Sequence, residues 1–164
     1  MKTQDECGII IIDHDRGRKS IAAAIPQAGK EFISMKILSI GNSFSTDAQR
    51  WLHDIALSDG YALDCVNLYI GGCSLERHYR NMMSGDAVYR YEINGDTGNA
   101  LPVSLKDALQ REAWDVVTLQ QNSRFAGIAE SLLKERGKIK SIVNRASLYL
   151  KAENISVNYT SRNE

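Results

Sequence analysis

Apolar and polar positions alternate in blocks between about residues 35 and 128. Short apolar runs at 36–40, about 63–70 and 115–119 predict buried strands, and each is followed by glycine or amide residues that end a strand. Between these runs, apolar residues recur at helical spacing. Strands that alternate with helices favour an α/β fold in which helices cover both faces of a parallel sheet.

The helix after the first strand has the clearest signals. Thr46 followed by Gln49 has the spacing of a capping box, which predicts a helix start. One face of this helix is apolar, and we expect that face to cover one side of the sheet. Its residues are Ala48, Trp51, Leu52, Ile55 and Ala56.

Three further elements follow from local signals. Ser74 can begin a second helix, with Leu75, Tyr79 and Met82 on its apolar side. Residues 88–93, the turn Asn94-Gly95 and a return at 101–103 predict a small hairpin. Ser104 can cap a third helix that carries Leu105, Ala108 and Leu109.

The two ends of the chain differ from this middle part. Residues 1–34 show no clear period, and we expect an irregular extension that is dispensable for the fold, with Met35 as a plausible translation start. Residues 129–164 predict a basic helical tail, which is a solvated amphipathic helix or else a surface that contacts nucleic acid, a membrane or another subunit. We therefore expect the regular domain to span residues 35–128, between these ends.

Composition narrows the function classes. The formal net charge is zero, so nothing global attracts nucleic acid or an anionic membrane, and we expect neither as a partner. The longest early apolar run, Ile9–Ile12, is too short for a signal peptide or a membrane span, which favours a cytoplasmic location. The three cysteines have no C-x-x-C spacing, and we predict no cofactor and no metal.

Candidate chemistry lies at the ends of the predicted strands, where open parallel sheets collect ligands. Gly41-Asn42-Ser43, Gly71-Gly72-Cys73-Ser74 and Gln120-Gln121-Asn122-Ser123 follow the three strands in that order. An exposed serine at a helix start, with glycine N–H groups and an amide beside it, has the parts of a nucleophile and an oxyanion hole. Each part alone is also explained as a turn or cap residue.

These segments resemble the motifs of SGNH-type (GDSL-like) serine hydrolases. K-I-L-S-I-G-N-S-F-S resembles the first motif, Y-I-G-G-C-S-L-E-R-H the second and D-V-V-T-L-Q-Q-N-S the third. More narrowly, they resemble an uncharacterised bacterial SGNH-like domain family. The resemblance implies a flavodoxin-like three-layer fold in which Ser43 is the nucleophile and Gly72 and Asn122 complete the oxyanion hole. Gly71 and Gln121 are secondary candidates for those two donors.

The sequence departs from the family at several positions. Asn42 replaces the usual Asp, and the Asp-x-x-His element near the C-terminus is missing, because no histidine follows His78. His78, one turn after Ser74, is the remaining candidate base. We therefore expect a truncated SGNH-type esterase, with carbohydrate deacetylation as one form, acting on a small-molecule ester and weak or inactive by itself. The alternative is an α/β module that binds a small molecule or anion without chemistry. The sequence does not indicate an oligomeric state.

Overall fold

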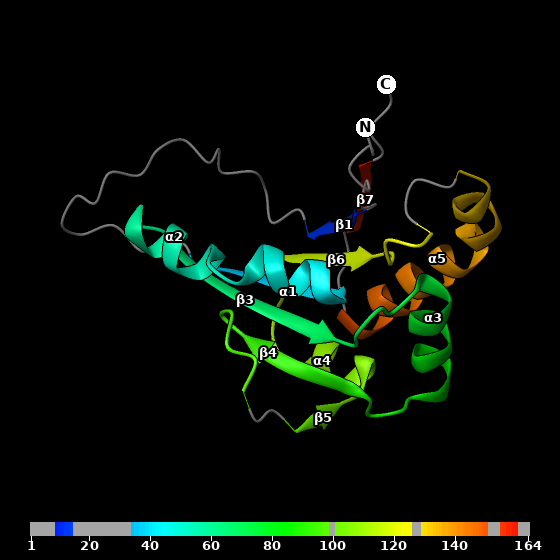
Figure 1. The fold of residues 1–164 in the computed structure, drawn as a ribbon, viewed down its shortest axis with the longest axis horizontal. Coiled ribbons are helices and arrows are strands. Elements are labelled where there is room, and N and C mark those ends of the chain that lie inside the picture. The colour runs from blue at the N-terminus through cyan, green and yellow to red at the C-terminus, as the bar shows by residue number, and fades with distance from the viewer. Residues whose placement is uncertain (1–8, 15–33, 99–100, 126–128, 151–154, 161–164) are drawn as a thin grey trace.

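The computed structural model describes residues 9–14, 34–98, 101–125, 129–150 and 155–160. Within these ranges, seven strands form one sheet, and five helices pack against it (Figure 1). The strands are β1 (Ile9–His14), β2 (Ser34–Gly41), β3 (Ala62–Tyr69), β4 (Tyr89–Ile93), β5 (Pro102–Val103), β6 (Val116–Gln120) and β7 (Ile155–Thr160). The helices are α1 (Ser43–Gln49), α2 (Leu52–Ser58), α3 (Leu75–Ser84), α4 (Leu105–Arg111) and α5 (Ala129–Leu150).

The centre of the sheet is parallel. The strand order is β5-β4-β3-β2-β6-β1-β7, and β2 pairs in parallel with β3 on one side and β6 on the other. In chain order these three strands are arranged 2-1-3, which is the flavodoxin-like arrangement expected from the sequence. The outer strands differ from that expectation, because β4, β5, β1 and β7 are antiparallel to their neighbours. The fold is therefore α/β with a parallel core and antiparallel edges.

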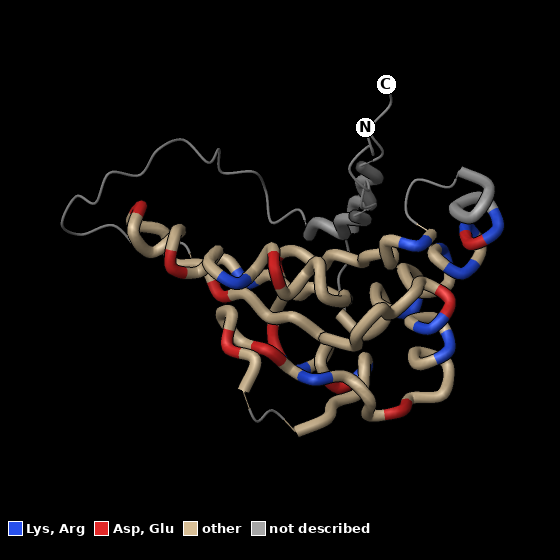
Figure 2. The backbone as a smooth tube through the Cα atoms, in the orientation of Figure 1, with Lys and Arg blue, Asp and Glu red and all other residues tan. Residues whose placement is uncertain are grey.

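The hydrophobic core lies on the face of the sheet covered by α3, α4 and α5. Alternate residues of the central strands point to this face, including Leu38, Leu68 and Leu119, all fully buried. They pack with apolar residues of the three helices into one cluster, to which α5 contributes Ile139, Ile142, Val143 and Ala146. The described part of α5 thus belongs to the same hydrophobic core as the central strands, α3 and α4. Several Lys and Arg positions lie along α3 and α5 (Figure 2), and Lys138 of α5 forms an ion pair with Glu76 of α3.

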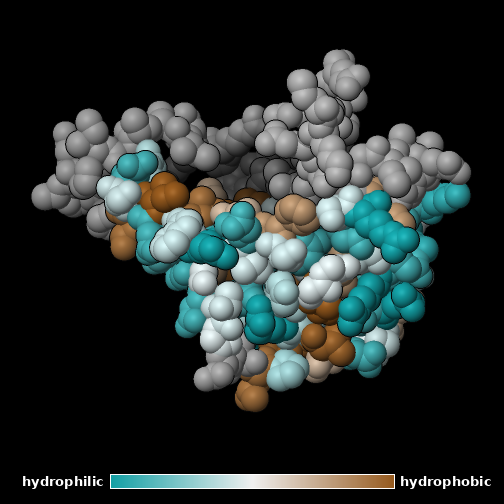
Figure 3. Space-filling model, viewed as in Figure 1, coloured by the Kyte–Doolittle hydropathy of each residue, from teal (hydrophilic) through white to brown (hydrophobic). Residues whose placement is uncertain are grey.

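The opposite face carries α1 and α2, and here the predicted helix is wrong in two respects. It is broken at Arg50 and Trp51 into two short helices, and most of its expected apolar face is not buried, because Ala48, Trp51 and Ile55 are exposed while Leu52 and Ala56 are half-buried. Trp51 is 63% exposed and Ile55 57% exposed, and apolar surface is visible over α2 in Figure 3. The buried residues of α1 are the polar Ser45 and Gln49. The physical reason is that the sheet presents polar residues on this face, so α1 turns its polar side inward.

The remaining local predictions are confirmed. Ser74 and Ser104 accept hydrogen bonds as N-caps of α3 and α4, and β4 pairs antiparallel with β5 after the turn at Asn94 and Gly95. Within the expected N-terminal extension, Ile9–His14 forms strand β1 between β6 and β7. Among the described residues, no helix has both the length and the apolar character needed to cross a membrane.

Candidate functional site at the strand ends

Ser43 begins α1 directly after β2. The helix starts earlier than Thr46, because Asn42 is the N-cap: its Oδ1 accepts from the backbone N–H of Phe44 at 3.1 Å. Ser45 closes the capping box by accepting from the N–H of Asn42 at 2.9 Å. The predicted box of Thr46 and Gln49 is therefore wrong.

The side chain of Asn42 connects the ends of all three central strands. It is 1% exposed, and its Nδ2 donates to the carbonyl of Cys73 at 3.2 Å and to that of Gln121 at 3.3 Å. Cys73 follows β3, and Gln121 follows β6. The three predicted strand ends therefore meet at one edge of the sheet, where a single amide joins them.

The predicted site residues lie around this junction. Ser43 is exposed, and no hydrogen bond of its side chain is found to the residues that the structure describes. Asn122 Nδ2 donates to the carbonyl of Gly72 at 3.1 Å, and Gly72 has a φ of 59°, so these two residues are in direct contact. A Cβ on Gly71 would lie 3.1 Å from the Tyr69 hydroxyl, so that glycine lets the chain pass close to Tyr69. The catalytic roles of Ser43, Gly72 and Asn122 stay predictions.

Gln121 has a structural task in this arrangement. Its side chain is buried, and Oε1 accepts from the N–H of Leu75 at the start of α3 and from the N–H of Asn122, both at 3.0 Å. Its Nε2 donates to Glu135 of α5 at 3.1 Å. Burial raises the pKa of Glu135, and the hydrogen bond from Gln121 opposes that shift. Gln121 thus ties β6 to α3 and α5.

His78, the remaining candidate base, lies inside the core. It is fully buried, stacks on Tyr89 with ring centroids 5.7 Å apart, and its Nδ1 lies 2.9 Å from the Tyr89 hydroxyl and 3.5 Å from Cys73 Sγ. Burial lowers the pKa of His78 to about 3 and raises that of Cys73 to about 11. Both groups are therefore uncharged near neutral pH, and neither is placed to serve a surface nucleophile. Cys65 is likewise buried, with a pKa raised to about 11.

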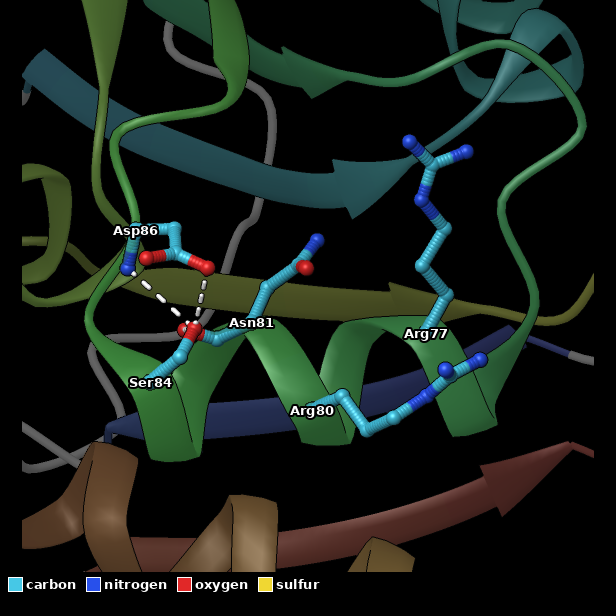
Figure 4. Close-up of a pocket in the computed structure, with 5 residues that line it drawn as sticks. All are labelled: Arg77, Arg80, Asn81, Ser84 and Asp86. Atoms are coloured by element: carbon cyan, nitrogen blue, oxygen red, sulfur yellow. Dashed lines mark hydrogen bonds between the residues drawn. The ribbon is translucent and has the colours of Figure 1, made fainter.

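A shallow depression of about 320 Å³ lies elsewhere, along α3 and the turn that follows it. Figure 4 shows Arg77, Arg80 and Asn81 on α3, with Ser84 hydrogen-bonded to Asp86 at 2.7 Å. None of these residues belongs to the strand ends described above. In the part of the chain that the structure describes, no group of three or more His, Cys, Asp or Glu side chains is arranged to hold a metal ion.

Sequence reasoning missed a buried polar layer beneath α1. Ser39, Asn67, Glu92 and Thr118 are cross-strand neighbours on four adjacent strands, and they face the same side. Ser39 accepts from Gln49 at 2.6 Å, and Thr118 donates to Ser39 at 2.8 Å. A signal was present, because Ser39, Asn67 and Thr118 each interrupt an otherwise apolar strand. Polar residues at matched positions of paired strands indicate a polar face.

The geometry thus defines an α/β protein with a polar junction at the carboxyl ends of its parallel strands. Residues 36–163 match the family DUF4886, a domain of unknown function, and the chain belongs to that family. The matched region continues past residue 128 into residues 129–164, which were predicted from the sequence to form a tail. A comparison with curated proteins finds no match.

A solved structure is also similar to this chain. It is the crystal structure at 1.50 Å resolution of a DUF4886 family protein from Bacteroides uniformis ATCC 8492, with 31% sequence identity and a TM-score of 0.61. The similarity covers 69% of this chain and 45% of that one, so the chain spans less than half the length of this relative. The family description names no activity.

Proposed function

We propose that this chain carries the nucleophile and oxyanion-binding part of an SGNH-type esterase site. The observation that supports the proposal best is the junction built by Asn42, which brings the ends of β2, β3 and β6 together. Ser43, which follows Asn42, is exposed at the start of a helix, and Gly72 and Asn122, which adjoin the other two strand ends, are in contact with each other. Backbone N–H groups and an amide near a serine hydroxyl suit a developing oxyanion.

In the proposed reaction, Ser43 Oγ attacks the ester carbonyl carbon while a base takes its proton. The alcohol leaves with a proton, and water then hydrolyses the acyl-serine. Two histidines have described side chains, and neither suits the role of base: His78 is enclosed by Tyr89 and Cys73, and His53 Nδ1 contacts the Leu63 carbonyl at 2.6 Å. We therefore expect only weak turnover from this chain by itself.

Exogenous imidazole tests the proposal, because it supplies the missing base. The purified chain is treated with a fluorophosphonate, in which attack of Ser43 on phosphorus expels fluoride, and the labelled residue is identified by mass spectrometry. We expect slow labelling of Ser43 that imidazole accelerates. Ser123→Ala, a matched change at another strand end, should not alter it, whereas Ser43→Ala should abolish it.

Two outcomes would contradict the proposal. If imidazole produces no labelling of Ser43 in the folded chain, the site is not a hydrolase site, and the module that binds a small molecule or anion without chemistry becomes the better interpretation. If the chain alone hydrolyses p-nitrophenyl acetate rapidly, and both Ser43→Ala and His78→Ala abolish that activity, the chain carries its own base and the expectation of weak activity is wrong.

A further inference from the structure

The buried layer under α1 includes a carboxylate whose position needs an explanation. The Glu92 side chain is 3% exposed, on strand β4 next to Asn67 of β3. Burying a carboxylate is costly unless it is fully hydrogen-bonded. Glu92 meets this requirement: Oε1 accepts from Arg90 Nε at 2.8 Å and also from Arg90 Nη2, while Oε2 accepts from Asn67 Nδ2 at 2.8 Å and Thr46 Oγ1 at 2.9 Å.

These contacts set the orientation of the neighbouring groups. All four are donated to Glu92, so the carboxylate is an acceptor at each of them. Asn67 must therefore point its Nδ2 toward Glu92 and Thr46, at 2.8 and 2.9 Å, which leaves its Oδ1 as an acceptor on the other side. The assignment of the Asn67 amide follows from this network.

The orientation continues to the residue before Ser43. Ser45 Oγ accepts from the N–H of Asn42 at 2.9 Å, and it lies 2.8 Å from Asn67 Oδ1 and 2.7 Å from the Asn42 carbonyl oxygen, so these two acceptors share its one proton. Thr46 is fixed on the same turn, because its backbone N–H donates to the Asn42 carbonyl at 3.1 Å. A path of hydrogen bonds thus runs from Glu92 through Asn67 and Ser45 to the backbone of Asn42, where Ser45 contacts both the N–H and the carbonyl.

The packing at this turn leaves little room for another arrangement. A Cβ on Gly41 would lie 1.9 Å from Ser45 Oγ, so the glycine is what allows Ser45 to fold back against the end of β2. The Arg90 guanidinium lies 4.2 Å from the centre of the Tyr69 ring, which restrains it on the far side of Glu92. Both ends of the path are therefore held in place.

We propose that Glu92 is a positioning residue for Ser43: through Asn67 and Ser45 it fixes the turn that presents the serine hydroxyl at the strand-end junction. This inference rests on the proposed function for its consequence in catalysis. The positioning itself is a property of the fold, so the two can be tested separately.

The test uses the full chain and four substitutions. Glu92→Gln keeps the size of the side chain but presents an NH₂ donor to neighbours that also donate. Thr46→Val removes one of the donors to Glu92 without changing the side-chain shape, and Thr46→Ser restores that hydroxyl. Tyr89→Phe is the control for general loss of stability, because it removes a buried hydroxyl from the same strand β4 on the opposite face.

Two measurements are made on each variant. The first is hydrogen exchange of the amides of Asn42, Phe44 and Thr46, which all donate within the turn. The second is the rate of imidazole-assisted fluorophosphonate labelling of Ser43. Since a buried hydrogen bond to a charged group changes an equilibrium by about tenfold or more, we expect Glu92→Gln and Thr46→Val to speed exchange and slow labelling by about tenfold. Thr46→Ser and Tyr89→Phe should stay within about twofold of the wild type at these amides.

The outcomes separate the two ideas. Unchanged exchange in both Glu92→Gln and Thr46→Val would overturn the positioning role. Faster exchange with an unchanged labelling rate would also overturn it, because the turn would then not control Ser43. If the wild type is never labelled at Ser43, the proposed function fails, and the positioning role for catalysis fails with it, whereas the exchange data still show whether Glu92 holds the turn. Should Glu92→Gln not fold, the pair Thr46→Val and Thr46→Ser decides the question.

Discussion

Asn42 provides the sharpest test of how the junction is built. Asn42→Asp would keep the acceptor for the N–H of Phe44, so the cap of α1 would survive. It would replace Nδ2, which donates to the carbonyls of Cys73 and Gln121 at 3.2 and 3.3 Å, by an oxygen. Two attractive contacts would become two repulsive ones in a buried place.

The magnitude follows from these contacts. Each carbonyl that loses its donor costs about 1 kcal/mol, and the buried carboxylate adds a further penalty, which the favourable charge at the start of α1 offsets by about 0.5–1 kcal/mol. We expect a net loss of about 2–4 kcal/mol at pH 8. That loss corresponds to a fall of about 1–2 M in the midpoint of urea unfolding.

The pH dependence gives an independent check. Burial beside two carbonyl oxygens should raise the pKa of the introduced carboxyl group in the folded variant above its unfolded value of about 3.9. The native state then binds more protons than the unfolded state, so the variant should lose stability, relative to the wild type, as the pH rises through the raised pKa. At lower pH the protonated side chain can donate to one carbonyl, and part of the loss should be recovered.

The assay is urea unfolding of the wild type and Asn42→Asp at pH 8 and pH 5. Asn122→Asp is the matched control, because the same change there affects one exposed hydrogen bond, to the Gly72 carbonyl, and should cost less than about 1 kcal/mol. If Asn42→Asp is as stable as the wild type at both pH values, Asn42 does not join the strand ends as described.

Two further predictions concern glycine turns and buried histidine. Gly95→Ala should cost about 2 kcal/mol or more of folding stability, since Gly95 has a φ of 80° and a Cβ there would lie 2.3 Å from the carbonyl oxygen of Arg50. Gly72→Ala, with a φ of 59° and open space around it, should cost about 1 kcal/mol. Thermal unfolding measures both losses, and equal losses would contradict the close approach of Gly95 to Arg50. Burial lowers the pKa of His78 from 6.5 to about 3, so between these pH values the unfolded state binds more protons than the folded state. The folding stability should therefore fall as the pH drops below 6.5, by about 3 kcal/mol at pH 4. Urea unfolding of the wild type and His78→Gln at pH 7 and pH 4 checks this, and the same pH dependence in both would show that His78 is not the cause.

The sequence by itself determined the local elements and their order. Ser74 and Ser104 mark helix starts because a hydroxyl that accepts a backbone N–H works within one turn, whatever the rest of the chain does. The turn at Asn94 and Gly95 is also local, because it depends on the backbone conformations that these two residues adopt readily. The sequence also predicted that the residues after the three strands lie together, because strands that are parallel and adjacent end at one edge of a sheet.

Only the tertiary structure decided which face of each element is buried and against what. The spacing of Ala48, Trp51 and Ile55 predicted one continuous helix with an apolar face, but the chain breaks at Arg50 and Trp51. The sheet beneath α1 presents Ser39 and Asn67, so the polar side of α1 turned inward, and Trp51 and Ile55, which lie beyond α1, stayed exposed. His78, one turn after Ser74, was a candidate base by its position in the sequence, yet it lies in the core, stacked on Tyr89 of another element. Burial, hydrogen-bond partners and pKa depend on such long-range contacts, which spacing along one segment does not contain.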